Sequence, residues 1–297
     1  MLTLLLKMTA LCWKALLIVF LSAGNSSPAL GKNQLARIVD EILNRYRLSY
    51  EAESTTGRVT TRYPMFSLAV SLPYDKEKQM YDFSSLDSGE EVRRTILNCD
   101  VYTGRRVVAA TVLRWPNVLS QCPDGHVPWP HILKKCPAWV KTWSDVNKWC
   151  TDKVPKGTAD HAEYRTLQKL NTLANNDKSS DLLLFYVLAS PCDKRCTSET
   201  SHRSILNSIN QIVNWVKYAV VFSDVFQPRD GPKIPETELR DSLMRLGTNQ
   251  VNKRSIGLNN IFRCNGNPVQ CTSCSSNNQV SPYCYSDEAS SPNLPPI

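Results

Sequence analysis

The sequence lacks a hydrophobic run long enough to span a membrane. Its first apolar stretch, residues 15–21, falls well short of the roughly 20 residues that a membrane-spanning helix needs, and no later segment approaches that length. Lys7 and Lys14 precede this stretch and small residues follow it, a layout typical of a cleaved signal peptide. We therefore expect residues 1–24 to be a signal peptide and the mature protein to be secreted without a membrane segment. An uncleaved anchor stays an alternative, because apolar residues before Lys14 could extend the run.

Histidine is scarce, with four residues in 297, and no internal repeat is present. The formal net charge of +8 becomes +6 once Lys7 and Lys14 leave with the signal peptide. This moderate basic excess is compatible with an anionic substrate, but it is equally typical of a protein that is kept soluble by its charge.

Cysteine is abundant, with eleven residues, and the pattern favours disulfides. Cys12 leaves with the signal peptide, and Cys192 and Cys196 form a pattern of their own. The other eight form an even set, as expected in an oxidising compartment: Cys99, Cys122, Cys136, Cys150, Cys264, Cys271, Cys274 and Cys284. Their two clusters predict mostly local pairing, although the sequence alone does not choose the partners.

Hydrophobic periodicity predicts alternating helices and strands. Apolar stripes at helical spacing cover residues 35–46, 161–174, 205–216 and 239–247, the last ending at Gly247 as a cap. Apolar or alternating runs predict strands over residues 66–72, 107–113, 182–188, 218–222 and 256–262. The polar segment 75–78 is assigned to a surface insertion.

These elements predict one domain over residues 33–264. A segment rich in Pro, Trp and Cys at 116–155 is assigned to a disulfide-stapled insertion. Residues 265–297 form a Cys-rich tail whose composition predicts no buried core and a disordered end.

Two short motifs point to a metal site. His161-Ala162-Glu163 opens a predicted helix, and the segment PCDKRC at residues 191–196 follows a buried strand. A catalytic zinc ion typically has three protein ligands and one open position, which His161, Cys192 and Cys196 would satisfy. We expect both cysteines in the first turn of a helix, where the helix dipole favours thiolates. Glu163 is then placed to carry protons.

Other interpretations of these residues stay open. A cysteine pair after an apolar strand is also typical of a thioredoxin-like redox site, a structural disulfide or a structural zinc site. In the Cys-rich insertion, His126 and His131 are weaker candidates for a second metal. The four cysteines from Cys264 onward have the density of a zinc knuckle, but disulfides are favoured for them.

The two motifs resemble the H-x-E and P-C-x-x-C signature of zinc deaminases. The order of elements over residues 35–262 is similar to that of the cytidine deaminase superfamily, and Ala189-Ser190-Pro191-Cys192 is similar to the S-P-C form of AID/APOBEC deaminases. With a signal peptide, the closest resemblance is to secreted AID/APOBEC-like deaminases of fish. It implies an α/β fold of three layers, with a mixed five-stranded sheet flanked by helices.

The resemblance also implies an activity, which is hydrolytic conversion of cytosine to uracil. His161, Cys192 and Cys196 would bind Zn²⁺, and Glu163 would act as general acid and base. The implied substrate is single-stranded nucleic acid, contacted by the loop 227–235 through Arg229 and Lys233. The tryptophan of the family's S-W-S-P-C form is absent, and the Cys-bearing segments are additional. A deaminase of free cytosine nucleosides and a non-catalytic, disulfide-stapled secreted binding protein are therefore kept as alternatives.

Overall fold

The computed structural model describes residues 30–53, 59–228 and 232–289, so the expected signal peptide at 1–24 lies outside the described residues. Within those ranges, no helix has the length and apolar character that crossing a membrane requires.

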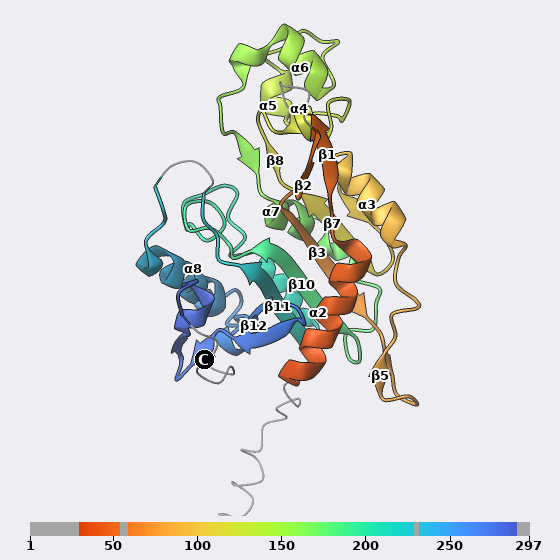
Figure 1. The fold of residues 1–297 in the computed structure, drawn as a ribbon, viewed down its shortest axis with the longest axis vertical. Helices are drawn as coiled ribbons and strands as arrows, with labels where there is room; N and C mark the ends of the chain where they lie inside the picture. The colour runs from red at the N-terminus through yellow and green to blue at the C-terminus, as the bar shows by residue number, and fades with distance from the viewer. Residues whose placement is uncertain (1–29, 54–58, 229–231, 290–297) are drawn as a thin grey trace, which may run out of the picture. The chain divides into compact units, whose positions relative to one another are not determined.

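A mixed sheet of seven strands, ordered β13-β12-β11-β10-β3-β7-β6, organises the structure (Figure 1). β10 pairs parallel with β11, and β11 with β12, while the other neighbours pair antiparallel. The strands are β3 (Phe66–Leu72), β6 (Tyr102–Thr103), β7 (Val107–Thr111), β10 (Leu182–Ala189), β11 (Lys217–Asp224), β12 (Ile261–Asn265) and β13 (Gln270–Ser273). The mixed α/β fold is confirmed. Five strands form its centre as expected, although β12 begins at Ile261 and not at residue 256, and short β6 and β13 extend the two edges.

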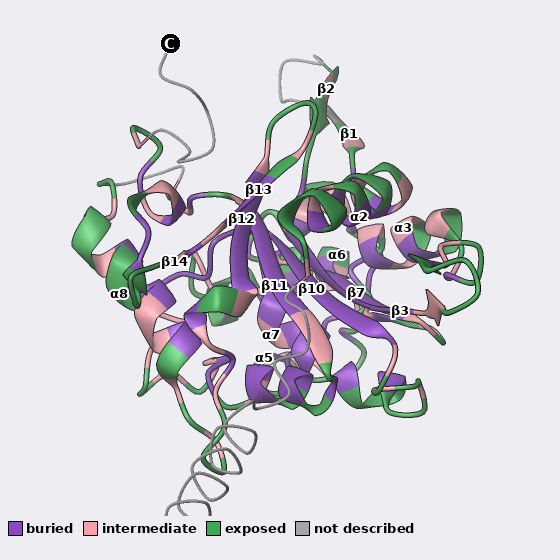
Figure 2. Cartoon of the chain, turned by 90° about the horizontal axis from the view of Figure 1, so that it is seen from below, coloured by how far each residue is buried: buried purple, intermediate pink, exposed green. Residues whose placement is uncertain are grey.

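Helices cover both faces of the sheet, which gives the expected three layers (Figure 2). α2 (Lys32–Tyr46) and α3 (Gly89–Leu97) lie on one face. α7 (Ala162–Leu167) and α8 (Glu236–Thr248) contribute to the hydrophobic cluster on the other. Because β10 lies between two strands and under both layers, nearly every one of its side chains is buried, which explains its continuous apolar sequence.

The connection from β3 to β7 contains a β-hairpin and a helix that the sequence did not predict. Residues 75–78 turn within a hairpin of β4 (Tyr74–Asp75) and β5 (Met80–Tyr81), and Asp75 accepts backbone hydrogen bonds from Glu77 and Lys78. The helix α3 follows and was missed, although Ser88 accepts the amide of Glu91 as its N-cap. That spacing is a recognisable helix-start signal.

Two predicted helices are shorter than expected. The range 161–174 divides into α7 and a 3₁₀ turn at Leu170–Leu173, and the range 205–216 contains only a 3₁₀ turn, Ile209–Asn214. The side-chain amide of Asn210 donates to the carbonyl of Leu206, which an α-helix would use for the backbone amide. The apolar stripe is nonetheless buried except for Val216, so periodicity identified most of the inward face but not the type of turn.

The insertion at 116–155 has a hydrophobic core of its own. It contains α4 (Val118–Gln121), α5 (Pro130–Leu133), α6 (Trp143–Trp149) and a 3₁₀ turn, Thr151–Lys153. Trp129 and Trp143 are almost completely buried and meet edge to face. Disulfides Cys99–Cys122 and Cys136–Cys150 fix the segment. β8 (Leu113–Arg114) pairs with β9 (Ala159–Asp160) where the segment leaves and rejoins the main fold.

The residues after Cys264 are part of the fold, contrary to the expectation from composition. β12 and β13 pair across the Cys264–Cys271 disulfide, and Cys274–Cys284 joins the main hydrophobic cluster. β14 (Ser275–Ser276), β15 (Gln279–Val280) and a 3₁₀ turn, Pro282–Cys284, complete this region. Two short disulfide-closed loops compensate here for the scarcity of large apolar side chains. Residues 290–297 lie outside the described part of the chain.

Near the C-terminus, Gly247 also has a different role from the one expected. It lies inside α8, and the helix cap is Asn249. A Cβ atom at Gly247 would approach a side-chain carbon of Leu258, in the 3₁₀ turn Leu258–Asn260, to 2.7 Å. The glycine therefore permits close packing rather than a left-handed turn.

Candidate metal centre

His161 and Glu163 come from the start of α7, which packs against β3 and β7. His161 is the N-cap residue, with an extended backbone, and it directly follows β9. Glu163 lies in the first turn and is 6% exposed. The helix therefore holds a histidine at its N-cap and a buried carboxyl group in its first turn.

Cys192 and Cys196 lie in the segment that follows β10, and their sulfur atoms face His161. The Nδ1 atom of His161 is 3.1 Å from Sγ of Cys196 and 3.5 Å from Sγ of Cys192. The two sulfurs are 3.4 Å apart, and Oε1 of Glu163 is 3.8 Å from Sγ of Cys196. The three candidate ligand atoms thus lie within 4.8 Å of one another, with a carboxyl group beside them.

The cysteines of this cluster are chemically distinct from the others. Cys192 and Cys196 are free and buried, whereas the other eight described cysteines form four disulfides with sequence separations of 7 to 23 residues. The pairing is local, in line with the two clusters in the sequence. Two sulfurs and one imidazole nitrogen form a donor set that suits a catalytic zinc ion with one open position.

Comparison with known families identifies the fold to which this cluster belongs. The family model described as Secreted Novel AID/APOBEC-like Deaminase 1 matches residues 147–288, a range that contains His161, Glu163 and both free cysteines. The match supports assigning this part of the chain to the AID/APOBEC-like deaminase family. Comparisons with curated proteins and with solved structures found no match.

The chain departs from the family signature in the segment between Cys192 and Cys196. Three residues separate Cys192 from Cys196, one more than in P-C-x-x-C. The expected helix is absent, and the described residues 193–196 form turns. Because no helix N-terminus is present, the segment must be held by other contacts. The interpretation that a helix dipole stabilises the thiolates is therefore wrong for this chain.

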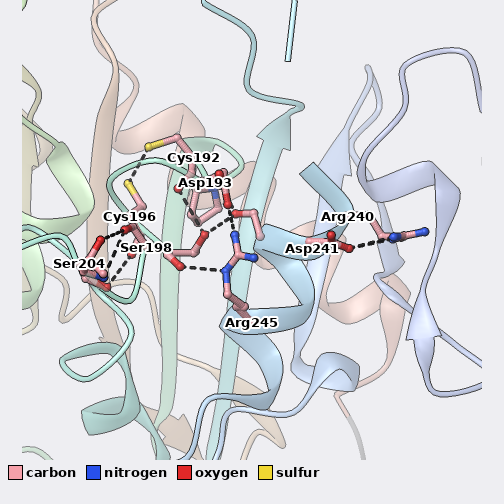
Figure 3. A network of polar contacts seen from close by, with 12 residues as sticks. Cys192, Asp193, Cys196, Ser198, Ser204, Arg240, Asp241 and Arg245 are labelled. Carbon is pink, nitrogen blue, oxygen red and sulfur yellow. Dashed lines mark hydrogen bonds and ion pairs between the residues drawn. The ribbon is translucent and has the colours of Figure 1, made fainter. Parts of the chain in front are cut away.

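The helix α8 provides these contacts (Figure 3). The hydroxyl of Ser242 donates to the carbonyl of Pro191 at 2.8 Å and lies 2.8 Å from the hydroxyl of Thr197. Arg245 forms an ion pair with Asp193 and donates from Nε to the Thr197 carbonyl at 3.0 Å. Ser242 therefore holds the cysteine segment at both ends, through Pro191 and Thr197. Arg245 holds it at Thr197 and, through Asp193, between the two cysteines.

These α8 residues were not identified from the sequence. The signal was present, since Ser242 interrupts the apolar stripe of α8 and is nonetheless 1% exposed. A hydroxyl group on the buried side of a helix needs a partner. Which partner it finds depends on the tertiary fold, so the sequence could indicate the residue but not its role.

A second set of contacts joins the cysteine segment to the residues before His161. Arg195 donates to the carbonyls of Ala159, at 2.9 Å, and Gly157, at 3.3 Å. Asp160 accepts from the indole nitrogen of Trp129 at 2.9 Å and pairs with Arg203. The Cys-rich insertion is thereby linked to the residue that directly precedes a candidate ligand.

Burial and mutual contact shift the pKa values in the cluster. Burial raises the pKa of Glu163 above its usual value, partly opposed by the charge of His161. The hydrogen bond between the two sulfurs is the largest cause that lowers the pKa of Cys192, whereas that bond and burial raise the pKa of Cys196. For His161, burial is the largest single cause and lowers the pKa, but the hydrogen bond to Cys192 and the charges of Cys192 and Glu163 together outweigh it, so the pKa is raised. Of the four groups, only Cys192 is thus favoured in a negatively charged form, a thiolate of the kind that binds zinc.

Other candidate metal ligands are not brought together. Among the described residues, His161, Cys192 and Cys196 are the only group of three or more potential ligands. His126 forms an isolated bridge with Thr142, and His131 lies beside the ring of Trp129. The cysteines from Cys264 onward are all in disulfides, which agrees with the favoured interpretation of that cluster.

The expected substrate loop follows β11 and is joined to the residues before Cys192. The hydroxyl of Ser190 accepts the amide of Phe226 at 2.9 Å. Gln227 closes the loop, since its side chain accepts the amide of Ile234 and donates to the same residue's carbonyl. Lys233 is exposed. Arg229 lies outside the described residues.

Proposed function

We propose that this protein is a secreted, zinc-dependent cytosine deaminase that acts on single-stranded nucleic acid. The observation that supports it most directly is the cluster itself. Only Cys192 and Cys196 are left free among the described cysteines, and they meet His161 next to the buried Glu163. A redox dithiol needs neither the histidine nor the carboxyl group.

His161, Cys192 and Cys196 would hold the zinc ion. Zinc, when bound, supplies the Lewis acidity that activates water at neutral pH. Glu163 would take a proton from water and deliver it to N3 of the base as a C–O bond forms at C4. It would then move the proton of the new hydroxyl group to the amino group, so that the C–N bond breaks, ammonia leaves and the C4 carbonyl of uracil remains. The burial of Glu163 suits this role, because a raised pKa makes the carboxylate a better proton acceptor than an ordinary, exposed one.

The substrate assignment rests on the family and on the loop after β11. Lys233 is exposed there and could contact phosphate, and we retain Arg229 as its proposed companion. Lys233→Ala should lower the salt dependence of substrate binding, since each lost phosphate contact reduces the number of released counterions. An unchanged salt dependence would remove this residue from the site. Free cytosine nucleosides are the alternative substrate.

Secretion is proposed on two grounds. The matched family is described as secreted, and four disulfides are typical of an oxidising compartment. The proposed signal peptide, residues 1–24, can be tested by N-terminal sequencing of protein recovered from the medium of expressing cells. A mature N-terminus close to residue 25 is the expected result.

Zinc content and deamination, measured on the same samples, test the central proposal. Wild-type protein should contain one zinc ion per chain and convert cytosine to uracil in a single-stranded oligonucleotide. Cys192→Ala should lose both properties, because it removes a ligand. Glu163→Gln should keep its zinc and lose deamination by several orders of magnitude, because a similar side chain remains but cannot carry the proton.

Cys271→Ala with Cys264→Ala is the matched control, since it also removes sulfur atoms but from a disulfide. It should lower the stability while leaving the zinc content unchanged. A wild-type protein without zinc, or a Glu163→Gln protein with full activity, would contradict the proposal.

A further inference from the structure

Two tryptophans of the insertion face the solvent while its other large apolar side chains face inward. Trp139 is 64% exposed and Trp149 is 52% exposed, whereas Val140, Trp143 and Val146 are buried in the core of the insertion. Large exposed aromatic side chains in an otherwise well-packed segment are typical of binding surfaces.

The two rings form one preformed surface. Their centroids are 6.4 Å apart, with an interplanar angle of 83°. Trp139 follows Cys136 by three residues and Trp149 precedes Cys150 by one, and these cysteines form a disulfide. The backbone on both sides is thus constrained before any partner binds, which lowers the entropy cost of binding.

The segment that carries the two tryptophans is basic. Residues 133–156 contain six lysines and two aspartates. Asp145 caps α6 and Asp152 pairs with Lys153, and the six lysines and two aspartates together leave this segment with a formal charge of +4. The ammonium group of Lys148 lies 4.9 Å from the ring centroid of Trp149. In the described part of the chain, no ion pair engages Lys134, Lys135, Lys141 or Lys148.

Aromatic faces among lysines fit a single nucleic-acid strand, in which unpaired bases stack and phosphates need cations. A membrane would require exposed aliphatic side chains as well, but those of the insertion are in its core. We propose that the Trp139–Trp149 surface and its lysines bind single-stranded nucleic acid outside the metal centre. The proposal rests on the proposed function for the nature of the ligand, but the binding itself requires neither zinc nor Glu163.

Binding of an oligodeoxythymidine to the full mature chain tests this directly, because thymine cannot be deaminated. Fluorescence anisotropy of a labelled 20-mer should show about tenfold weaker binding for Trp139→Ala and for Trp149→Ala, the loss expected for one stacked base. Val216→Ala is the matched control, since Val216 is also a large apolar residue and is 55% exposed. Its affinity should equal that of the wild type.

The lysines are tested through salt dependence. Lys141→Gln and Lys148→Gln should each reduce the slope of log affinity against log salt by about 0.7, the value for one phosphate contact on a single strand. Lys76→Gln, at the exposed β4–β5 turn, should leave the slope unchanged. If the Lys141→Gln and Lys148→Gln proteins keep the slope of the wild type, as Lys76→Gln should, the proposed phosphate contacts are overturned.

An abasic strand of the same length provides the strictest comparison. The abasic strand should bind at least tenfold more weakly than oligodeoxythymidine. The affinity for heparin, a polyanion without bases, should be the same with and without either tryptophan. Equal binding of the abasic strand would overturn base stacking, and tryptophan-dependent binding of phosphatidylserine vesicles in place of the oligonucleotide would identify a membrane surface instead.

The two proposals fail separately. Deamination of a short oligonucleotide with unchanged binding by Trp139→Ala and Trp149→Ala would reject this surface and leave the proposed function intact. Tryptophan-dependent binding by a wild-type protein that holds no zinc would support this surface and reject the proposed zinc-dependent activity.

Discussion

The cysteine segment 191–197 and the insertion 116–155 both lack long helices, yet each is fixed by different chemistry. Two disulfides and a tryptophan core hold the insertion. The cysteine segment contains two sulfurs as well, but hydrogen bonds and an ion pair from α8 hold it. A segment whose thiols must stay available for a metal cannot be stapled through those thiols. Neutral and charged hydrogen bonds from a neighbouring helix are the alternative that leaves them free.

Removing a staple should have the largest effect on stability. The double variant Cys136→Ser, Cys150→Ser should lower the free energy of unfolding by about 3 kcal/mol, because it opens a loop of 14 residues. Chemical denaturation measures this change, with two states assumed only if fluorescence and circular dichroism agree. Zinc content should stay at the wild-type value. Loss of zinc in this variant would show that the two regions are not independent.

Removing the α8 contacts should instead change zinc binding more than the free energy of unfolding. Ser242→Ala and Arg245→Ala should each weaken zinc affinity tenfold to a hundredfold, as is typical when groups that orient metal ligands are lost. Competition with a zinc chelator measures the affinity, and the absorption of the cobalt-substituted protein reports the thiolate geometry.

Arg240→Ala is the matched control for these variants. Arg240 is on the same helix, but it pairs only with its neighbour Asp241 at the surface, away from the cysteine segment (Figure 3). Its zinc affinity should equal that of the wild type. If Arg245→Ala behaves like Arg240→Ala, the ion pair with Asp193 does not position the cysteines.

Acid should produce the smallest of these effects, and its effect on the insertion can be traced to one carboxyl group. Backbone hydrogen bonds from Thr142 and Lys141 hold the pKa of Asp145 below its usual value of 3.8. A carboxyl group with a lowered pKa in the folded state stabilises α6 above pH 4, and this stabilisation is lost as the pH falls through the folded pKa. Fluorescence of Trp149 at the end of α6 should therefore change below pH 4. Asp145→Asn should abolish that pH dependence, and a persistent transition would assign it to another group.

Much of the candidate site could be predicted because the ligand types and their order are local properties of the chain. His161 and Glu163 open a predicted helix and the two cysteines follow an apolar strand, so their positions at the ends of these elements could be anticipated. Helix lengths were less predictable. Asn210 and the residues around Cys196 form side-chain hydrogen bonds that compete with helical ones, and periodicity does not report such competition.

By itself, the sequence determined the alternation of helices and strands, the inward face of each and the identity of the proposed zinc ligands, because these depend on residue type and spacing. The tertiary structure decided which cysteines pair, how the residues after Cys264 enter the core, and that α8 holds the segment between Cys192 and Cys196. Those outcomes depend on distances between residues far apart in the chain. Such distances are fixed only when the whole core packs.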